Sequence, residues 1–354
     1  MARSALSWLR ANLFNGWIST AVTLALLYLL AGLALDFAGW AVADAVWTLP
    51  PGDSAACRAE GAGACWGFIA QTHRFLLFGT YPLAEQWRPA LACLLFVALY
   101  AVSAPRRFWR RELLVVWAAG LALIFGLMGG GIAGLPVVPA SQWGGLPVTL
   151  ILATVGIAGA FPLAVLLALG RQAAGLPAIR TLCVLYIELI RGVPLISLLF
   201  MASVMLPLFL PEGMSVDKLM RAQIAIILFA AAYLAEVIRG GLQALPKGQY
   251  EAADALGLGY WRKMGLVILP QALRLVIPPL VNTFIGLFKD TSLVLIIGIY
   301  DLLNAAKTTV VDPVWLGFGV EAYLTVAAIF FVFCFAMSRY SQRLEVALNQ
   351  GMRR

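Results

Sequence analysis

The stretch from residue 113 to residue 170 decides the fold class: LLVVWAAGLALIFGLMGGGIAGLPVVPASQWGGLPVTLILATVGIAGAFPLAVLLALG. Its 58 residues include no Asp, Glu, Lys or Arg. A helix of about 20 apolar residues suffices to cross the hydrocarbon core of a bilayer. Six glycines and three prolines within 129–147 divide the stretch, which predicts one helix over 113–131 and another over 148–169. Two membrane spans are therefore expected here.

The rest of the chain has the same character. Of its 354 residues 62% are apolar and 12% are charged, whereas soluble domains average about 25% charged residues. Further apolar stretches predict helices at 17–35, 89–105, 192–210, 222–239, 275–298 and 322–338. The first could also be a cleaved signal peptide, but its apolar stretch exceeds the usual 7–15 residues or so, which favours a membrane anchor. The sequence predicts an all-α polytopic membrane protein with about eight transmembrane helices.

The basic residues predict which side of the membrane each loop faces. If the N-terminus is inside, 18 of the 25 basic residues lie in inner segments, including Arg3, the four arginines of 106–111, Arg353 and Arg354. Six lie in outer loops, and Lys289 is at membrane depth. Positive charge concentrates on the cytoplasmic side, so both termini are expected inside. The net charge of +8 is thus an orientation signal, and no nucleic-acid partner is expected.

The five cysteines show no CxxC and no metal-ligand spacing, so no metal site is expected. Cys93, Cys183 and Cys334 lie in or beside apolar stretches and are expected to be packing residues. Cys57 and Cys65 share the polar loop 37–89, which is expected outside. A disulfide between these two is possible in an oxidising compartment, and the sequence leaves both states open.

A long polar loop, 240–274, connects two predicted spans on the inner side. Within it Gln249 to Leu256 is predicted to form a short helix, with Pro246 and Gly248 before it and glycines at 257 and 259 after it. Ala252, Ala255 and Leu256 fall on one face at helical spacing, and Gly259 continues that face. Small side chains there would let another protein approach the backbone closely. The alternative is a solvated connector, although connectors are usually much shorter.

The same loop resembles the signature of the permease subunits of ABC importers, EAA-x3-G-x9-I-x-L-P. It contains Glu251-Ala252-Ala253, Gly257 and Val267-Ile268-Leu269-Pro270, with Val267 where the pattern has Ile. The segments YIELIRGVPL (186–195), YLAEVIRGG (233–241) and KDTSL (289–293) are similar to the polar amino-acid, HisMQ-like subfamily. LFGTYP (77–82) and EQWR (85–88) resemble the longer AapM-type permease of the general L-amino-acid importer. The resemblance to the type I permease core covers about 146–342.

The resemblance implies a five-helix type I core at 146–342, preceded by an extension at 1–145 with three further helices and followed by a cytoplasmic tail at 343–354. It implies a bacterial inner-membrane permease that imports L-amino acids, with the loop 240–274 coupling to an ATPase through Glu251, Ala252, Ala253, Ala255, Leu256, Gly257 and Gly259. None of the five lysines lies in a GK[ST] context. ATP hydrolysis is therefore expected on a separate ATPase dimer, with no catalytic residue and no cofactor in this chain. A homologous permease and a periplasmic amino-acid-binding protein are the other expected partners.

Charges at membrane depth are costly and usually face a protein interior or a water-filled cavity. Lys289 and Asp290, followed by Thr291 and Ser292, therefore either line the translocation path or form structural ion pairs with other helices, or the helix is broken there. Glu188 and Arg191 stand at i,i+3, as do Glu236 and Arg239. Each pair is expected to form a local salt bridge near the inner interface.

Other classes of protein remain as alternatives. An importer permease for another small polar solute fits the loop equally well, because the loop does not specify the substrate. An ion-coupled secondary transporter would need more membrane-buried carboxylates and gives the loop 240–274 no role. A membrane scaffold or sensor would have no ATPase partner.

Overall fold

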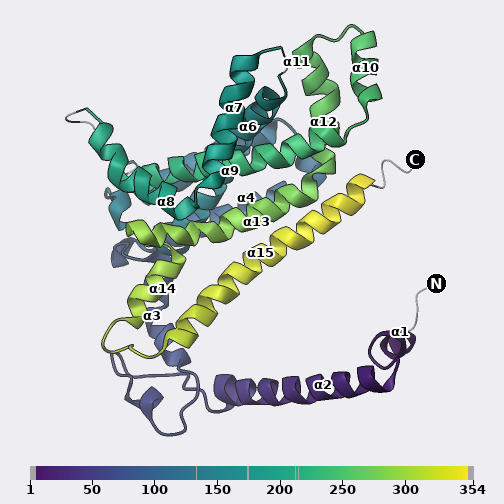
Figure 1. Cartoon of the computed structure of the whole chain (residues 1–354). Helices are drawn as coiled ribbons and strands as arrows, with labels where there is room; N and C mark the ends of the chain where they lie inside the picture. Colours follow the sequence, from purple (N-terminus) through teal and green to yellow (C-terminus); the bar gives the residue numbers. More distant parts are fainter. Residues whose placement is uncertain (1–4, 133, 174, 212, 214, 350–354) are drawn as a thin grey trace. The chain divides into compact units, whose positions relative to one another are not determined.

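The computed structural model describes residues 5–349 except 133, 174, 212 and 214. These residues are mainly helical, and their β-type contacts are two isolated bridges, Val46 with Cys65 and Gly145 with Asp301. The α-helices, most of which are labelled in Figure 1, are α1 (Ala5–Asn12), α2 (Trp17–Ala38), α3 (Trp66–Phe78), α4 (Trp87–Ser103), α5 (Glu112–Gly129), α6 (Gly145–Gln172), α7 (Pro177–Gly192), α8 (Leu195–Phe200), α9 (Lys218–Ala244), α10 (Lys247–Ala255), α11 (Tyr260–Arg262), α12 (Leu269–Leu275), α13 (Ile277–Asp290), α14 (Leu302–Val310) and α15 (Gly319–Asn349).

Seven helical segments of the described chain are long and apolar enough to cross a membrane. They are Trp17–Ala43, Leu83–Ser103, Glu112–Gly129, Gly145–Gln172, Lys218–Ala244, Ile277–Ile297 and Gly319–Leu348. A bent pair, α7 with Leu195–Phe209, makes up to eight. The all-α polytopic fold class is confirmed. Arg3, Arg353, Arg354 and the last five residues of the predicted tail lie outside the described residues.

The prediction of one helix over 192–210 is wrong at its beginning. The structure has α7, which ends at Gly192, and a second helical segment, Leu195–Phe209, turned by 101° from it (Figure 1). Pro194 explains the break, because proline has no backbone N–H to donate and pushes the residue before it out of the α conformation. Val193 accordingly has extended angles, φ −109° and ψ 133°. The inner segment before residue 192 is thus a helix.

Packing divides the chain into two compact units, one formed by 1–72 with 310–322 and the other by 73–309 with 323–354. These boundaries differ from those that the family resemblance predicts, at 145/146 and 342/343. The helices α3 and α15 each contribute to both units.

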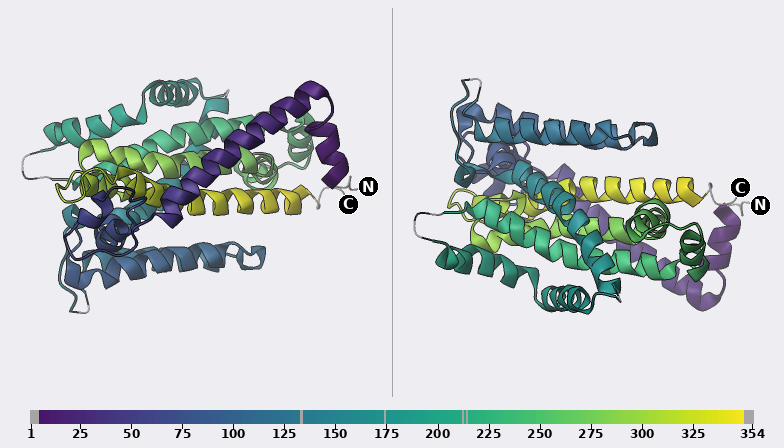
Figure 2. Two further views of the ribbon diagram at one scale, coloured as in Figure 1. Left: turned by 90° about the horizontal axis from the view of Figure 1, so that it is seen from below. Right: turned by 90° about the horizontal axis from the view of Figure 1, so that it is seen from above.

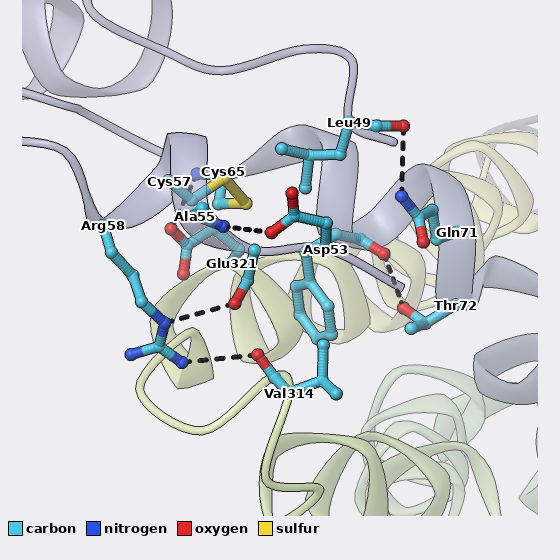
Figure 3. Close-up of a disulfide and its surroundings, with 12 residues drawn as sticks. Leu49, Asp53, Ala55, Cys57, Arg58, Cys65, Gln71, Thr72, Val314 and Glu321 are labelled. Atoms are coloured by element: carbon cyan, nitrogen blue, oxygen red, sulfur yellow. Dashed lines mark hydrogen bonds between the residues drawn. A yellow bond between two sulfur atoms is a disulfide. The ribbon is translucent and has the colours of Figure 1, made fainter. Parts of the chain in front are cut away.

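The first unit contains a disulfide, for which the sequence left both states open. Cys57 and Cys65 are bonded, with their Cα atoms 5.5 Å apart (Figure 3). The first turn of α15 contacts this loop, because Glu321 Oε1 accepts a hydrogen bond of 2.9 Å from the Cys65 backbone N–H. Arg58 donates to the carbonyl oxygens of Val314 and Leu316 at 3.3 and 2.9 Å. The predicted polar loop 37–89 is therefore a folded structure that contains α3.

In the second unit α6 packs along α9, and small residues set their separation. A Cβ atom at Gly156 would lie 2.9 Å from the Ile226 side chain, and one at Gly159 would lie 2.9 Å from Ile227. Glycine therefore lets the two backbones approach closely, as is common between transmembrane helices. Figure 2 shows α4 and α5 side by side as a hairpin. Tyr100 of α4 and Thr154 of α6 share a hydrogen bond of 2.5 Å.

Arg88, at the beginning of α4, is fully buried. Its Nε donates to the Leu127 carbonyl at 2.6 Å and its Nη1 to the Pro136 carbonyl at 3.0 Å. Carbonyl groups in the last turn of a helix have no partner within the helix and lie at its negative end. Arg88 therefore caps α5.

Candidate functional site

The loop that follows α9 begins with a sharp break. Leu245 is extended, with ψ 135°, and Pro246 precedes the first residue of α10. Because the residue before a proline disfavours the α conformation, α9 ends here and α10 begins in a new direction. The helix predicted over 249–256 is present as Lys247–Ala255.

The end of α10 depends on Gly257. This residue has φ +69°, the left-handed region that glycine enters at no steric cost. The Gly257 N–H donates to the Asp254 carbonyl at 2.9 Å, and the Leu258 N–H donates to the Ala253 carbonyl at 3.2 Å. This pair of bonds is the Schellman motif, which satisfies free carbonyls at a helix end. Gly259 differs, because its φ of −60° and ψ of 158° suit any residue.

The predicted coupling residues on α10 differ in their exposure to solvent. Ala253 is buried, with 2% of its surface exposed, whereas Glu251, Ala252 and Ala255 are exposed. Leu256 is 78% exposed. The Glu251 carboxylate has no hydrogen bond or ion pair to any residue that the structure describes. The outward surface of α10 therefore carries one free carboxylate, two small side chains and a large apolar side chain.

The segment from 260 to 275 contacts α10 and holds it in place. It consists of α11, a π-helical turn (Lys263–Ile268) and α12. Lys263 Nζ lies 2.5 Å from Asp254 Oδ1, and Gln271 Nε2 donates to Gln249 Oε1 at 3.0 Å. One contact thus lies at each end of α10, so the helix is held along its length.

The loop is also tied to α9. The Tyr250 hydroxyl donates to the Leu242 carbonyl at 3.0 Å, and burial raises the pKa of Tyr250. At Gly241 a Cβ atom would lie 2.7 Å from the Ala272 carbonyl oxygen and 2.8 Å from the Val276 side chain. Such distances leave no room for a side chain, so Gly241 allows α9 and α12 to touch. A Cβ at Gly240 would meet nothing within 4 Å.

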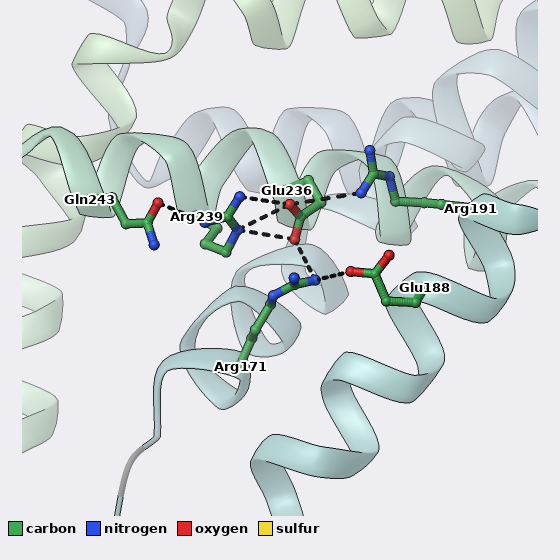
Figure 4. A network of polar contacts seen from close by, with 6 residues as sticks. All are labelled: Arg171, Glu188, Arg191, Glu236, Arg239 and Gln243. Carbon is green, nitrogen blue, oxygen red and sulfur yellow. Dashed lines mark hydrogen bonds and ion pairs between the residues drawn. The ribbon is translucent and has the colours of Figure 1, made fainter.

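An ion-pair network joins three helices near the end of α9 (Figure 4). Its centre is Glu236, whose side chain is 14% exposed. Arg171 of α6 lies 2.8 Å from Glu236 and 2.9 Å from Glu188 of α7. Arg239 binds Glu236 at 2.9 Å and donates to Gln243 at 2.6 Å. Arg191 of α7 also lies 3.8 Å from Glu236. The network therefore has three guanidinium groups and two carboxylates.

One of the two predicted local pairs is absent from the described contacts. Glu236 and Arg239 are paired, but Glu188 binds Arg171, and Arg191 contacts Glu236 and the ring of Tyr233, with 5.5 Å between its guanidinium carbon and the ring centroid. The i,i+3 pairing of Glu188 with Arg191 is therefore wrong, because α6 brings a better-placed guanidinium. Neither Arg171 nor Gln243 was predicted from the sequence to belong to this network. Arg171 is the first charged residue after the charge-free stretch 113–170, and this position at the end of a span could have indicated an ion-pair partner for the nearby carboxylates.

The four polar residues at membrane depth lie where α13 changes form. The α-helix ends at Asp290 and a 3₁₀ segment, Thr291–Ile297, continues the span. The Thr291 and Ser292 hydroxyls donate to the Phe288 and Lys289 carbonyls at 2.7 and 2.8 Å. Lys289 is exposed, Asp290 is half-buried, and neither forms an ion pair with another described residue. Nor does any described hydrogen bond or ion pair link these four to the Glu236 network or to α10.

The described part of the chain holds no cluster of three or more His, Cys, Asp or Glu that could bind a metal ion. The helices are those of a polytopic membrane protein, and the loop that contains α10 is held in place outside the membrane spans. The profile of the "binding-protein-dependent transport system inner membrane component" family matches residues 160–349. The chain belongs to this family, which makes it the membrane component of a binding-protein-dependent transport system.

Two relatives align along almost the whole chain. The "inner membrane amino-acid ABC transporter permease protein YhdY" of Escherichia coli (strain K12) is 51% identical over 98% of this chain and 94% of its own length. The "glutamate/glutamine/aspartate/asparagine transport system permease protein BztC" of Rhodobacter capsulatus is 38% identical over 99% of this chain and 95% of its own length. Both alignments therefore include the segment before residue 146.

A shorter relative and a solved structure match a smaller part. The "probable glutamine ABC transporter permease protein GlnP" of Bacillus subtilis (strain 168) is 33% identical over 58% of this chain and 92% of its own length. The "crystal structure of an amino acid ABC transporter with histidines" has 31% identity and a TM-score of 0.50, and covers 57% of this chain and 91% of that one.

Proposed function

We propose that this chain is the permease subunit of an ATP-driven importer that takes up L-amino acids across the bacterial inner membrane. Its family and the names of YhdY and BztC support the substrate class. One observation carries the coupling role: α10 is braced on one side and presents the unpaired Glu251 carboxylate and the exposed Leu256 on the other.

ATP hydrolysis belongs to a separate ATPase dimer in this proposal. None of the lysines of the chain lies in a GK[ST] sequence, which phosphate-binding loops require. ATP and Mg²⁺ are therefore cofactors of the partner, and this chain needs none and is no enzyme. Its contribution is to form the pathway and to move with the ATPase.

The docking surface for the ATPase is the outward face of α10 with the residues that follow it. Leu256 is 78% exposed and Trp261 is 70% exposed, although both lie outside the membrane spans. Large apolar groups that are exposed to water outside a membrane span mark contact surfaces. The neighbouring small residues, Ala252 and Ala255, let a partner approach the backbone, and Glu251 offers a charge for a basic or N–H donor.

The pathway is enclosed with a homologous sister permease, and a periplasmic amino-acid-binding protein delivers the substrate. Lys289 and Asp290 support a path-lining role, because each is an ionisable group at membrane depth without an ion-pair partner in the described chain. An amino acid presents a carboxylate and an ammonium group. A lysine and an aspartate in adjacent positions can address both charges as the substrate passes.

The test is reconstitution of this chain with the sister permease, the ATPase and the binding protein in vesicles, followed by amino-acid uptake and ATP hydrolysis. Glu251→Lys is expected to abolish uptake and the stimulation of ATPase activity by the binding protein, while the chain still inserts. The matched control is Glu345→Lys, which reverses the charge of another exposed carboxylate, on α15.

Normal coupled uptake by Glu251→Lys would refute the coupling role. Failure of the wild-type complex to take up any amino acid, with intact coupling of ATP hydrolysis to another solute, would refute the substrate class alone. The two parts of the proposal therefore fail separately.

A further inference from the structure

The turn between α4 and α5 concentrates positive charge at the end of a membrane hairpin. Its sequence, Arg106-Arg107-Phe108-Trp109-Arg110-Arg111, has four arginines in six positions. The first acidic residue after it is Glu112, which begins α5. The charge distribution places this turn on the inner side of the membrane, beside the lipid headgroups.

Hydrogen bonds hold the turn in one conformation. The Trp109 indole N–H donates to the Ser103 carbonyl at 2.8 Å, and the Trp117 indole N–H donates to the Ser103 hydroxyl at 2.8 Å. The backbone of 106–108 is a 3₁₀ turn, with the Trp109 N–H donating to the Arg106 carbonyl at 3.0 Å. Both aromatic side chains of the turn remain partly exposed, Phe108 by 41% and Trp109 by 48%.

One of the four arginines has a structural partner. Arg106 donates to the Ala347 and Leu344 carbonyls at 3.1 and 3.3 Å. These carbonyls lie in the last turns of α15 (Gly319–Asn349), where a cation caps the helix. Arg106 therefore fixes the end of the hairpin against the end of α15.

The other three arginines have no such partner. Arg107, Arg110 and Arg111 are exposed and make no ion pair with any described residue, and Arg107 stacks on the Phe108 ring, with 4.6 Å between its guanidinium carbon and the ring centroid. A guanidinium group binds phosphate through two parallel N–H bonds. Phenyl and indole rings are favourable at the depth of lipid headgroups. The turn thus presents three guanidinium groups that can bind phosphate, next to two aromatic rings that are favourable at the depth of the lipid headgroups.

We propose that Arg107, Arg110 and Arg111 form a binding site for the phosphate headgroup of an anionic phospholipid, with Phe108 and Trp109 inserted beside its acyl chains. Clusters of basic residues immediately inside a transmembrane helix attract anionic lipid, at about fivefold in affinity for each charge near the surface. Because Arg106 holds α15 against the same turn, the bound lipid contacts the hairpin where it meets the last helix.

The experiment compares lipid classes at the boundary of the protein. The full chain is reconstituted in phosphatidylcholine vesicles with spin-labelled phosphatidylglycerol or spin-labelled phosphatidylcholine, and the motionally restricted fraction of each gives the selectivity. The variant Arg107→Gln/Arg110→Gln/Arg111→Gln is expected to lose the preference for phosphatidylglycerol by at least about fivefold. The triple lysine variant keeps the charge and is expected to keep most of the preference.

Two controls test whether the preference arises at this turn and whether it is specific to a lipid. The variant Arg339→Gln/Arg343→Gln removes two arginines from the same end of α15 and is expected to keep the preference. Soluble glycerol phosphate, added at constant ionic strength, is expected to leave the restricted fraction unchanged. The proposal is overturned if the triple glutamine variant keeps the wild-type preference, if the α15 variant loses as much, or if glycerol phosphate competes, which would indicate a site for a soluble phosphate.

Discussion

Nη1 of Arg171, at the end of α6, lies 2.8 Å from Oε1 of Glu236, in α9. The same guanidinium nitrogen lies 2.9 Å from Glu188 of α7. Arg171 therefore bridges two carboxylates on two other helices. It is the contact that makes the inner ends of α6, α7 and α9 one cluster.

Replacement of Glu236 by Gln is expected to lower the free energy of unfolding by about 2 kcal/mol. Removal of one partner of a largely buried ion pair leaves the other charges uncompensated, and the partial exposure here reduces the full cost. Glu188→Gln is the matched control, because the Glu188 side chain is 55% exposed and such pairs contribute at most about 1 kcal/mol. Thermal unfolding of both purified variants measures the difference, and equal losses would contradict the central role of Glu236.

Gly241→Ala is expected to destabilise the contact of α9 with α12 by about 1–3 kcal/mol, since the added methyl group would overlap the Ala272 carbonyl. Gly240→Ala places the same methyl group in open space. There alanine improves helix propensity and is expected to stabilise by about 0.5–1 kcal/mol. A melting temperature that falls for the first variant and holds or rises for the second confirms the close approach. Similar shifts in both would argue against it.

Gly257→Ala is expected to cost about 1–2 kcal/mol, because alanine disfavours the left-handed conformation that ends α10. The effect is local, so hydrogen exchange should quicken at 253–258, and coupling to the ATPase should weaken. Gly259→Ala has an allowed backbone conformation and free space, so exchange in α10 should stay as in the wild type. Unchanged exchange in the Gly257 variant would show that the Schellman end is dispensable.

Asp301 predicts a pH dependence of stability. It is fully buried at the beginning of α14, and burial raises its pKa to about 6, although the Leu303 and Asn304 N–H groups donate to it. An acid whose pKa is higher in the folded state binds protons more readily when folded, so this group adds stability as the pH falls from about 6 to about 4. The change is at most about 3 kcal/mol.

The measurement is the melting temperature of the wild type minus that of Asp301→Asn between pH 4 and pH 7. Asparagine can still accept a hydrogen bond at the helix beginning but does not titrate. The difference is expected to rise as the pH falls. A difference that is flat over this range would contradict the raised pKa.

The spans could be predicted from the sequence because a charge-free apolar stretch is a local property. The helix at 247–255 was found for the same reason, since Pro246 and Gly257 are local signals. Pro194 fits a kink or the end of a span, but the helix over 192–210 was predicted to begin before it, because the apolar stretch continues through it and hydropathy does not report direction. Element ends are therefore less predictable than elements.

Contacts between side chains on different helices were harder to predict. The i,i+3 rule assigned Glu188 to Arg191, but the choice of partner depends on which helix packs beside α7, and that is a tertiary fact. Arg88 is one of the six basic residues that the charge distribution assigns to outer loops, yet it is buried and caps α5. A buried arginine is uncommon enough that composition alone gives no reason to expect one.

The unbroken length of α9 has a mechanical consequence. This helix extends without interruption from Lys218 to Ala244, has no proline inside it, and ends one residue before the break at Pro246. At about 1.5 Å per residue it is roughly 40 Å long, enough to reach from one water phase to the other. In the proposed importer α9 would move as a rigid rod, and α10 would be the part that the ATPase displaces. A displacement of α10 that the Tyr250–Leu242 contact passes to α9 would then tilt the far end, at Asp217, because α9 itself is continuous from Lys218 to Ala244.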